Sequence, residues 1–198
     1  MAENYEKPDF WAKKAASQGY PARSVYKLME IDKKFALLKP GQRVLDLGAA
    51  PGSWTLYVSQ VLNGNGHLTA VDLRRLKKIP ESGMITMIEG DMTAEDVRFR
   101  ARDGGLYDVV LSDAAPETTG NRLVDTTRSG VLVDCALFYA DTLLKAGGNL
   151  VVKIFQGSDS GALLRQVRAR FASGRTYKPT ACRSASFETY IIGLGKLA

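Results

Sequence analysis

The sequence has few of the residues on which metal sites and disulfide frameworks depend. It contains one histidine, His67, and two cysteines, Cys135 and Cys182, among 198 residues. The cysteines lie far apart and match neither a metal-binding motif nor a disulfide pattern, so we expect them to be reduced thiols in a cytoplasmic protein. No cluster of potential metal ligands is visible, and His67 stands where a strand is expected to begin. The sequence therefore predicts a site without a metal.

Long apolar runs are also missing. No run reaches the roughly 18 apolar residues that indicate a transmembrane helix, and the polar segment from Met1 to Lys14 has no apolar stretch typical of a secretory signal. With 45% hydrophobic and 24% charged residues, the composition is that of a globular protein. A chain of 198 residues suits one domain. We expect a monomer whose domain covers residues 21–198, after an N-terminal arm of residues 1–20.

Acidic residues are outnumbered, because 21 acidic and 27 basic residues give a formal net charge of +6. This moderate excess is compatible with a polyanionic partner but does not require one. The basic residues gather in groups, which are Lys13-Lys14, Lys33-Lys34, Arg74-Arg75 with Lys77-Lys78, and Arg165, Arg168 and Arg170. One such group alone indicates only a solvent-exposed face, whereas several groups on a basic domain favour binding to nucleic acid.

The N-terminal arm mixes aromatic residues with lysines. Its aromatic residues are Tyr5, Phe10, Trp11 and Tyr20, and they lie near Lys7, Lys13 and Lys14. Such a mixture can stack on unpaired bases while the lysines hold phosphates. The same aromatic residues can instead pack on the domain, and the sequence leaves both roles open.

Short apolar runs alternate with helical patterns, which predicts βαβ units around a mostly parallel sheet. The expected strands are Arg43–Leu47, His67–Asp72, Ile85–Glu89, Tyr107–Ser112, Asn149–Phe155 and Glu188–Leu194, with a further one near Thr176–Lys178. The expected helices are Ser24–Phe35, Ser53–Leu62, Ala94–Ala101, Thr127–Leu144 and Ser160–Phe171.

The C-terminal part of the chain refines this fold. The stretch Leu143–Gly148 has the form of a helix C-cap followed by a buried strand. The last strand follows the one before it after a connection too short for a crossover helix, which predicts an antiparallel pair. We therefore expect an α/β, Rossmann-like fold with a mostly parallel seven-stranded sheet, one antiparallel strand, and helices on both faces. This is the arrangement of class I methyltransferases.

The stretch from Val44 to Trp54 is the most informative of the chain. An apolar strand pattern contains Asp46, continues into a small-residue turn with Gly48 and Gly52, and then becomes helical. Glycines let a ligand lie against the backbone, and open α/β sheets bind ligands at the carboxyl ends of their strands. The glycine spacing matches neither common phosphate-binding loop. Together with the charge of Asp46, it favours a cationic ligand without phosphates, such as S-adenosylmethionine.

Two further acidic residues follow expected strands. Asp72 lies at the distance from the glycine loop at which an acidic residue typically binds the ribose hydroxyls of a nucleoside cofactor. Asp91 follows the next strand and can accept a hydrogen bond from an adenine amino group. Both have a structural alternative, since Asp72 can cap a turn and Asp91 can form an Asx turn or a helix N-cap before Thr93.

A second set of charged residues suggests chemistry at the same edge of the sheet. Asp113 follows the fourth strand, and Lys153 lies inside an apolar strand, where a lysine without a partner is rare. Glu188 begins the last strand and is a candidate partner for Lys153. The alternative for Lys153 is an edge lysine that reaches solvent. Lys27 lies on the first expected helix, and taken alone it would be interpreted as a surface lysine.

Several of these segments together resemble the FtsJ/RrmJ group of ribose 2′-O-methyltransferases. The segments are Ala22-Arg23-Ser24, Tyr26-Lys27-Leu28, Asp46–Gly52 with Trp54, Ser112–Pro116, Val151–Gly157 and the last strand with Glu188. The resemblance is collinear from about residue 20 to residue 194, and the motifs are specific in combination.

The resemblance implies both an activity and a site. The family's Lys-Asp-Lys-Glu catalytic tetrad falls on Lys27, Asp113, Lys153 and Glu188. S-adenosylmethionine is implied as the methyl donor, with contacts that fall on Gly52, Trp54, Asp72, Asp91 and Asp113. The implied substrate is a uridine ribose in the A-loop of 23S ribosomal RNA, in the large subunit. This chain differs from the bacterial pattern at Ser53, where the pattern has glycine, and at Glu117, which adds negative charge beside the expected RNA path.

The resemblance also suggests roles for the tetrad. Lys153 is assigned either as the base that takes the hydroxyl proton or as the group that orients the hydroxyl, and the sequence leaves this open. Asp113 would orient Lys153 and favour a cationic donor, and Glu188 would position the lysines.

Rival interpretations explain less of the sequence. A base-directed methyltransferase usually has an aromatic clamp or an Asn-Pro-Pro-Tyr type sequence after the fourth strand, and Ser112–Pro116 offers neither. A non-enzymatic RNA-binding assembly factor would not need the tetrad. A nicotinamide dehydrogenase would need a different glycine loop.

Overall fold

The computed structural model describes residues 9–76, 84–157, 159–183 and 186–198. Tyr5, Lys7 and the Lys77-Lys78 pair, which the sequence analysis singled out, lie outside these residues.

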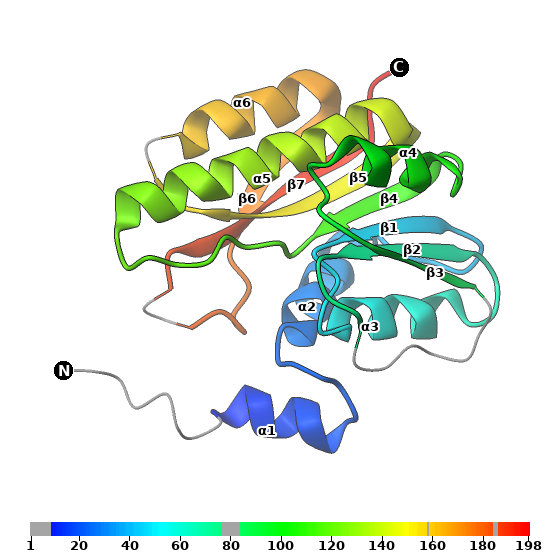
Figure 1. The fold of residues 1–198 in the computed structure, drawn as a ribbon, viewed down its shortest axis with the longest axis horizontal. Helices are drawn as coiled ribbons and strands as arrows, with labels where there is room; N and C mark the ends of the chain where they lie inside the picture. Colours follow the sequence, from blue (N-terminus) through cyan, green and yellow to red (C-terminus); the bar gives the residue numbers. More distant parts are fainter. Residues whose placement is uncertain (1–8, 77–83, 158, 184–185) are drawn as a thin grey trace.

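A seven-stranded sheet forms the centre of the molecule, in the order β3-β2-β1-β4-β5-β7-β6 (Figure 1). Its strands are β1 (Arg43–Leu47), β2 (His67–Asp72), β3 (Ile85–Glu89), β4 (Tyr107–Ser112), β5 (Leu144–Phe155), β6 (Phe171–Tyr177) and β7 (Glu188–Lys196). The pairs from β3 to β5 are parallel, whereas β7 runs antiparallel to both β5 and β6. The predicted Rossmann-like arrangement with one antiparallel strand is confirmed.

Three strands, β5, β6 and β7, differ in extent from the expectation, and β7 ends at Lys196 rather than Leu194. β5 begins at Leu144 rather than Asn149, because Leu144 already pairs with Tyr107 ahead of an irregularity in the register. The helix C-cap expected within Leu143–Gly148 is confirmed, because the helix ends at Leu143 and Leu144 is its C-cap, with an extended backbone that leads directly into the strand. β6 is also longer than expected, because its whole length pairs with β7.

The described residues form helices α1 (Phe10–Ser17), α2 (Val25–Phe35), α3 (Ser53–Leu62), α4 (Glu95–Arg102), α5 (Arg122–Leu143) and α6 (Ser160–Arg170). Helix α1 was not expected; the Asp9 side chain caps it by accepting from the Ala12 N–H at 2.9 Å. Helix α5 begins earlier than Thr127, because the Asn121 side chain accepts from the free N–H groups of its first turn. None of the described helices is long and apolar enough to span a membrane.

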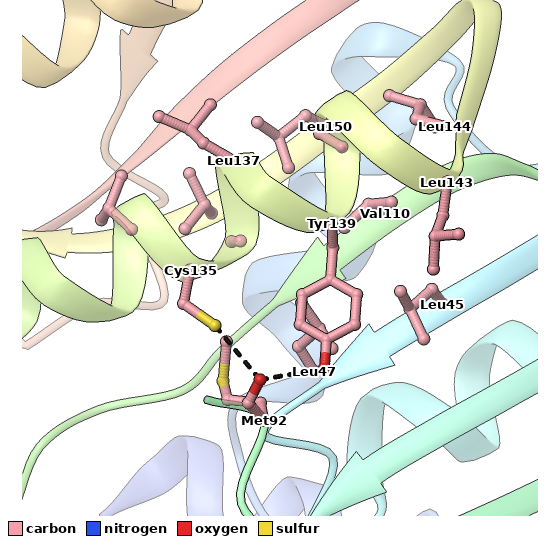
Figure 2. Packing of buried hydrophobic residues seen from close by; sticks show 14 of the residues in the cluster. Leu45, Leu47, Met92, Val110, Cys135, Leu137, Tyr139, Leu143, Leu144 and Leu150 are labelled. Atoms are coloured by element: carbon pink, nitrogen blue, oxygen red, sulfur yellow. Dashed lines mark hydrogen bonds between the residues drawn. The ribbon is translucent and has the colours of Figure 1, made fainter. Parts of the chain in front are cut away.

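Helices cover both faces of the sheet. Helices α4, α5 and α6 lie on one face, and α2 and α3 lie on the other (Figure 1). The larger core packs α5 against β1, β4 and β5, and in it the Met92 carbonyl oxygen accepts hydrogen bonds from Cys135 and Tyr139 (Figure 2). Both cores combine almost fully buried strand residues with residues of the covering helices, so the packed sheet holds the strand ends at its carboxyl edge in fixed positions.

Candidate active site

The glycine loop joins β1 to α3 at the carboxyl edge of the sheet. Gly48 has φ +74°, and a Cβ atom there would lie 2.6 Å from the Ala114 Cα, so the loop passes directly against the end of β4. Gly52, with φ +107°, is the N-cap of α3 and offers no side-chain hydrogen bond to the first turn. The first N–H groups of α3 therefore have no side-chain cap at the loop.

Ser53, which stands where the family pattern has glycine, makes a hydrogen bond that accounts for this difference. Its hydroxyl oxygen accepts a hydrogen bond from the Ala22 N–H at 2.7 Å, and the residue is 1% exposed. A glycine could not make this contact. Ser53 therefore ties the segment that leads into α2 to the glycine loop.

The two aspartates expected at the cofactor make local hydrogen bonds. Asp72 Oδ2 accepts from the Ala50 N–H at 2.9 Å, and its Oδ1 accepts from the Arg74 N–H. Asp91 Oδ1 accepts from both the N–H and the hydroxyl of Thr93, each at 2.8 Å. The turn-forming alternatives are thus present for both residues. Asp72 contacts the glycine loop through Ala50, whereas Asp91 follows the edge strand β3, on the far side of β2 from β1.

Trp54 is buried, with 2% exposure. Its indole N–H donates to the Ser24 carbonyl oxygen at 2.9 Å, and its ring lies 5.8 Å from that of Tyr190. The side chain belongs to the core between α2, α3 and the sheet. Only the backbone of Trp54, in the first turn of α3, remains available to a ligand.

Asp113 and Lys153 form one ion pair at the ends of β4 and β5. Lys153 Nζ lies 3.1 Å from Asp113 Oδ1 and donates to the Asp113 carbonyl oxygen at 2.5 Å. The Tyr190 hydroxyl donates to the same Oδ1 atom at 2.8 Å. The lysine and aspartate side chains are only 9% and 15% exposed, so the alternative of an edge lysine that reaches solvent is wrong.

Lys27 and Glu188 form a second ion pair beside the first. Lys27 Nζ lies 2.5 Å from Glu188 Oε1, and the side chains are 10% and 13% exposed. The Cys182 thiol also donates to Glu188 Oε1, at 3.2 Å. Glu188 thus pairs with Lys27 and not, as the sequence suggested, with Lys153. The four residues come from α2, β5, β7 and the segment after β4, and the fold brings them to one edge.

The family model described as FtsJ-like methyltransferase matches residues 20–196. The chain belongs to the FtsJ-like methyltransferase family. Among proteins of that kind, the ribosomal RNA large subunit methyltransferase E of Treponema denticola is 53% identical over 195 residues, which is 98% of each chain. The protein of the same name from Treponema pallidum is 46% identical over 188 residues, which cover 95% of this chain and 94% of the relative.

Solved structures agree with this assignment to the FtsJ-like family. A crystal structure described as a ribosomal RNA methyltransferase of Plasmodium falciparum superposes with a TM-score of 0.80 and 25% identity, covering 90% of this chain and 100% of the other. The structure of an rRNA methylase from Clostridium thermocellum, with a TM-score of 0.56 and 17% identity, shares the fold. The chain is a methyltransferase.

In this FtsJ-like site, opposite charges hold each other in their ionised forms. Burial raises the pKa of Asp113, but the ammonium groups of Lys153 and Lys27 and the hydrogen bond from Tyr190 outweigh it, so the pKa is lowered. Burial lowers the pKa of Lys27, but Asp113 and Glu188 outweigh it, so the pKa is raised. Burial and the nearby carboxylates raise the pKa of Tyr190 well above its usual value, which keeps the phenol a donor.

Asp46, below the glycine loop, has a different environment. It is fully buried, and burial raises its pKa to about 7, against the lowering effect of the hydrogen bond from the Thr55 hydroxyl. That hydroxyl donates to Oδ2 at 2.7 Å, while Oδ1 has no hydrogen-bond partner among the described residues. Asp46 therefore supports the loop from inside the core and does not present a free carboxylate on its surface.

Two residues of this site were missed in the sequence, Tyr190 and Cys182. Tyr190 lies two positions after Glu188 in β7, so the period of two in a strand places both on one face. That spacing could have identified it. Cys182 precedes β7 by a turn, and no local pattern relates it to Glu188. Within the part of the chain that the structure describes, no group of three or more His, Cys, Asp or Glu residues could hold a metal ion.

Proposed function

We propose that this methyltransferase transfers a methyl group from S-adenosylmethionine to a ribose 2′-hydroxyl of ribosomal RNA, at a uridine in the A-loop of the large subunit. The observation that carries the proposal is the meeting of the Lys153–Asp113 and Lys27–Glu188 pairs beside the glycine loop. The names of the relatives, which refer to the large-subunit RNA, support the choice of substrate.

The residues present fit S-adenosylmethionine. Gly48 lets the loop pass close to Ala114, where no side chain would fit. Gly52 caps α3 without a side-chain hydrogen bond, and the uncapped first turn of α3, which includes Trp54, suits a carboxylate. Asp72 and Asp91 would hold the nucleoside. Asp113 provides a buried carboxylate whose charge suits a sulfonium. When bound, S-adenosylmethionine supplies an activated methyl group.

The residues of the chain then act on the ribose. A charged lysine has three N–H donors, and Lys153 gives two of them to the oxygens of Asp113. The third would bind the 2′-hydroxyl and orient its lone pair toward the methyl group, and the hydroxyl proton would leave to solvent as the new bond forms. Lys27, held by Glu188, adds positive charge beside the alkoxide that develops. Positioning of this kind can contribute up to about 7–11 kcal/mol to catalysis.

The basic groups divide between the two edges of the sheet. Lys13 and Lys14 lie on α1, whose Trp11 ring packs on Tyr26, next to Lys27 in the chain. Arg74 and Arg75 follow the carboxyl end of β2. In contrast, Lys33-Lys34 and Arg165–Arg170 lie toward the ends of α2 and α6 that lead back to the amino edge. We assign the RNA surface to the first two groups, and with them to the N-terminal arm.

This assignment gives the arm a double role. Trp11 packs on the domain, and Lys14 lies over the rings of Trp11 and Tyr26, while Phe10 is 70% exposed and can meet a base. Ribosomal RNA as the substrate also supports a cytoplasmic enzyme, which we propose acts as a monomer.

The experiment that tests the proposed function is to map 2′-O-methyl groups on ribosomal RNA from cells with and without the protein. Loss of one uridine 2′-O-methyl group, restored by the purified protein with S-adenosylmethionine, is the expected result. A methyl group gained on a base atom would contradict the proposal, as would unchanged RNA together with no binding of S-adenosylmethionine.

A further inference from the structure

Three segments meet at the corner of the sheet beside the tetrad. Arg122 is the first residue of α5, Phe155 is the last residue of β5, and Phe187 directly precedes β7. Figure 1 shows the start of α5, the end of β5 and the start of β7 close together at the left of the molecule. The Gln156 N–H donates to the Phe187 carbonyl oxygen at 2.8 Å, and the Gln156 carbonyl oxygen accepts from Arg122 at 3.4 Å. The backbone thus holds the corner together.

The three side chains pack in one row, called the stack below, in which the two rings meet edge to face and Arg122 lies beside the outer ring. The rings of Phe155 and Phe187 meet at 64°, with centroids 4.8 Å apart. The guanidinium carbon of Arg122 lies 5.6 Å from the centroid of the Phe187 ring. Phe155 is almost buried, with 9% exposure, whereas Phe187 is half-buried and Arg122 is exposed. Phe155 therefore supports Phe187 from inside, and the outer part of the stack is open to solvent.

No carboxylate among the residues that the structure describes forms an ion pair with Arg122. Among the described residues, its contacts are with the Gln156 carbonyl oxygen and the Phe187 ring, and no ion pair includes it. In contrast, Arg170 near the other edge pairs with Asp141. A guanidinium that lies over an aromatic ring and pairs with none of the described carboxylates suits a ligand that is both flat and anionic.

The stack lies next to the reacting groups. In the β5–β7 pairing, Phe155 is opposite Glu188, and Lys153 is opposite Tyr190. Lys153 and Phe155 share one face of β5, about 7 Å apart along the strand. Phe187 adjoins Glu188 in the chain. A nucleotide whose ribose reaches Lys153 would therefore have a neighbour within reach of this corner.

We propose that Phe187 and Arg122 bind an unpaired base of the nucleotide next to the methylated ribose. Aromatic rings and guanidinium planes are the surfaces on which proteins stack unpaired RNA bases. The Phe155 ring holds Phe187 in place, and the charge of Arg122 favours the RNA backbone. This inference rests on the proposed function and adds to it a determinant of substrate binding that lies outside the tetrad.

The test compares the variants Phe187→Leu, Phe187→Tyr and Arg122→Ala with the wild type. The substrate is large ribosomal subunits from cells that lack the enzyme, and the control variant is Arg102→Ala, which removes an equal charge from an exposed residue at the end of α4. Thermal unfolding and the Kd for S-adenosylmethionine are measured for each variant, so that misfolding is detected separately.

We expect KM for the subunits to rise on the order of 10- to 100-fold in Phe187→Leu and about 10-fold in Arg122→Ala, as for the loss of one stacked base. Phe187→Tyr keeps a flat ring and should stay within about threefold of the wild type, as should Arg102→Ala. An unchanged KM in Phe187→Leu would overturn the proposal, and so would equal defects in Phe187→Leu and Phe187→Tyr. A wild-type enzyme that methylates no ribose would instead overturn the proposed function.

Discussion

Lys153 and Tyr190 are cross-strand partners in the antiparallel pair of β5 and β7, and both contact the same oxygen of Asp113. Lys153 Nζ lies 3.1 Å from Asp113 Oδ1, and the Tyr190 hydroxyl donates to it at 2.8 Å. Because both partners belong to the sheet, the carboxylate is held between two rigid strands. The antiparallel strand thus contributes directly to the geometry of the site.

Removal of the Lys153 amine should abolish methylation while the fold remains. In Lys153→Ala, the group that orients the hydroxyl is lost, so we expect kcat to fall by a factor of at least about 10². The measurement is transfer of a labelled methyl group from S-adenosylmethionine to large-subunit RNA, with circular dichroism as the check on folding. Wild-type turnover in Lys153→Ala would refute the role given to this residue.

Cys182 should matter through its hydrogen bond to Glu188. The thiol lies 3.2 Å from Oε1, and burial together with the Glu188 charge raises its pKa to about 12, so it remains a donor. Cys182→Ser keeps a donor, and we expect its kcat within about twofold of the wild type. Cys182→Ala loses the donor, and its kcat should fall about three- to tenfold. Equal activity of the two variants would show that the hydrogen bond is not needed.

Asp46 should make the stability of the protein depend on pH. Its pKa is raised from 3.8 to about 7 by burial, so its contribution to stability is fully present below pH 3.8 and is lost as the pH rises through about 7. In Asp46→Asn this loss cannot occur. Between pH 5 and pH 8.5, the free energy of unfolding of the wild type should fall by about 2–3 kcal/mol relative to that of the variant.

The measurement for Asp46 is the free energy of unfolding in denaturant at several pH values. The comparison between wild type and variant removes the contribution of all other titrating groups, since these are common to both proteins. Parallel pH profiles for the two proteins would be inconsistent with a carboxyl group that titrates near neutrality.

Charge reversal on α1 should weaken RNA binding. In the double variant Lys13→Glu and Lys14→Glu, we expect the affinity for large-subunit RNA to fall about tenfold and the salt slope to decrease by about one or two. Lys33→Glu with Lys34→Glu is the matched control, because Lys34 lies over Tyr177 as Lys14 lies over Tyr26. Binding curves from about 50 to 200 mM salt provide the measurement. Equal losses of RNA affinity in both double variants would show that α1 is not a specific part of the RNA surface.

Local patterns predicted most elements of the fold. Apolar runs identified β1 to β4 with their observed boundaries. For β1, β2 and β4 the reason is burial on both faces, which gives a clear sequence signature, whereas the edge strand β3 is partly exposed. The errors lie where a cap or a distant partner decides the boundary. Asn121 extends α5, Tyr107 extends β5, and β7 extends β6.

The prediction of the site had the same strengths and limits. The resemblance to a known family identified Lys27, Asp113, Lys153 and Glu188, and the fold brings all of them together. The ion pairs among these four residues were harder to predict, since Glu188 pairs with Lys27 rather than with Lys153. This pairing depends on β7, which lies between β5 and β6 and runs antiparallel to both. The register of β7 against β5 cannot be found from the sequence of one strand alone.

By itself, the amino-acid sequence determined the order of strands and helices, the glycine loop and the residue types at the edge of the sheet, because these depend on periodicity and on short segments. Only the tertiary structure decided which charges meet, that Cys182 and Tyr190 join them, and which basic groups lie beside the site. These contacts join residues far apart in the chain. They depend on strand pairing and helix packing, which no local pattern specifies.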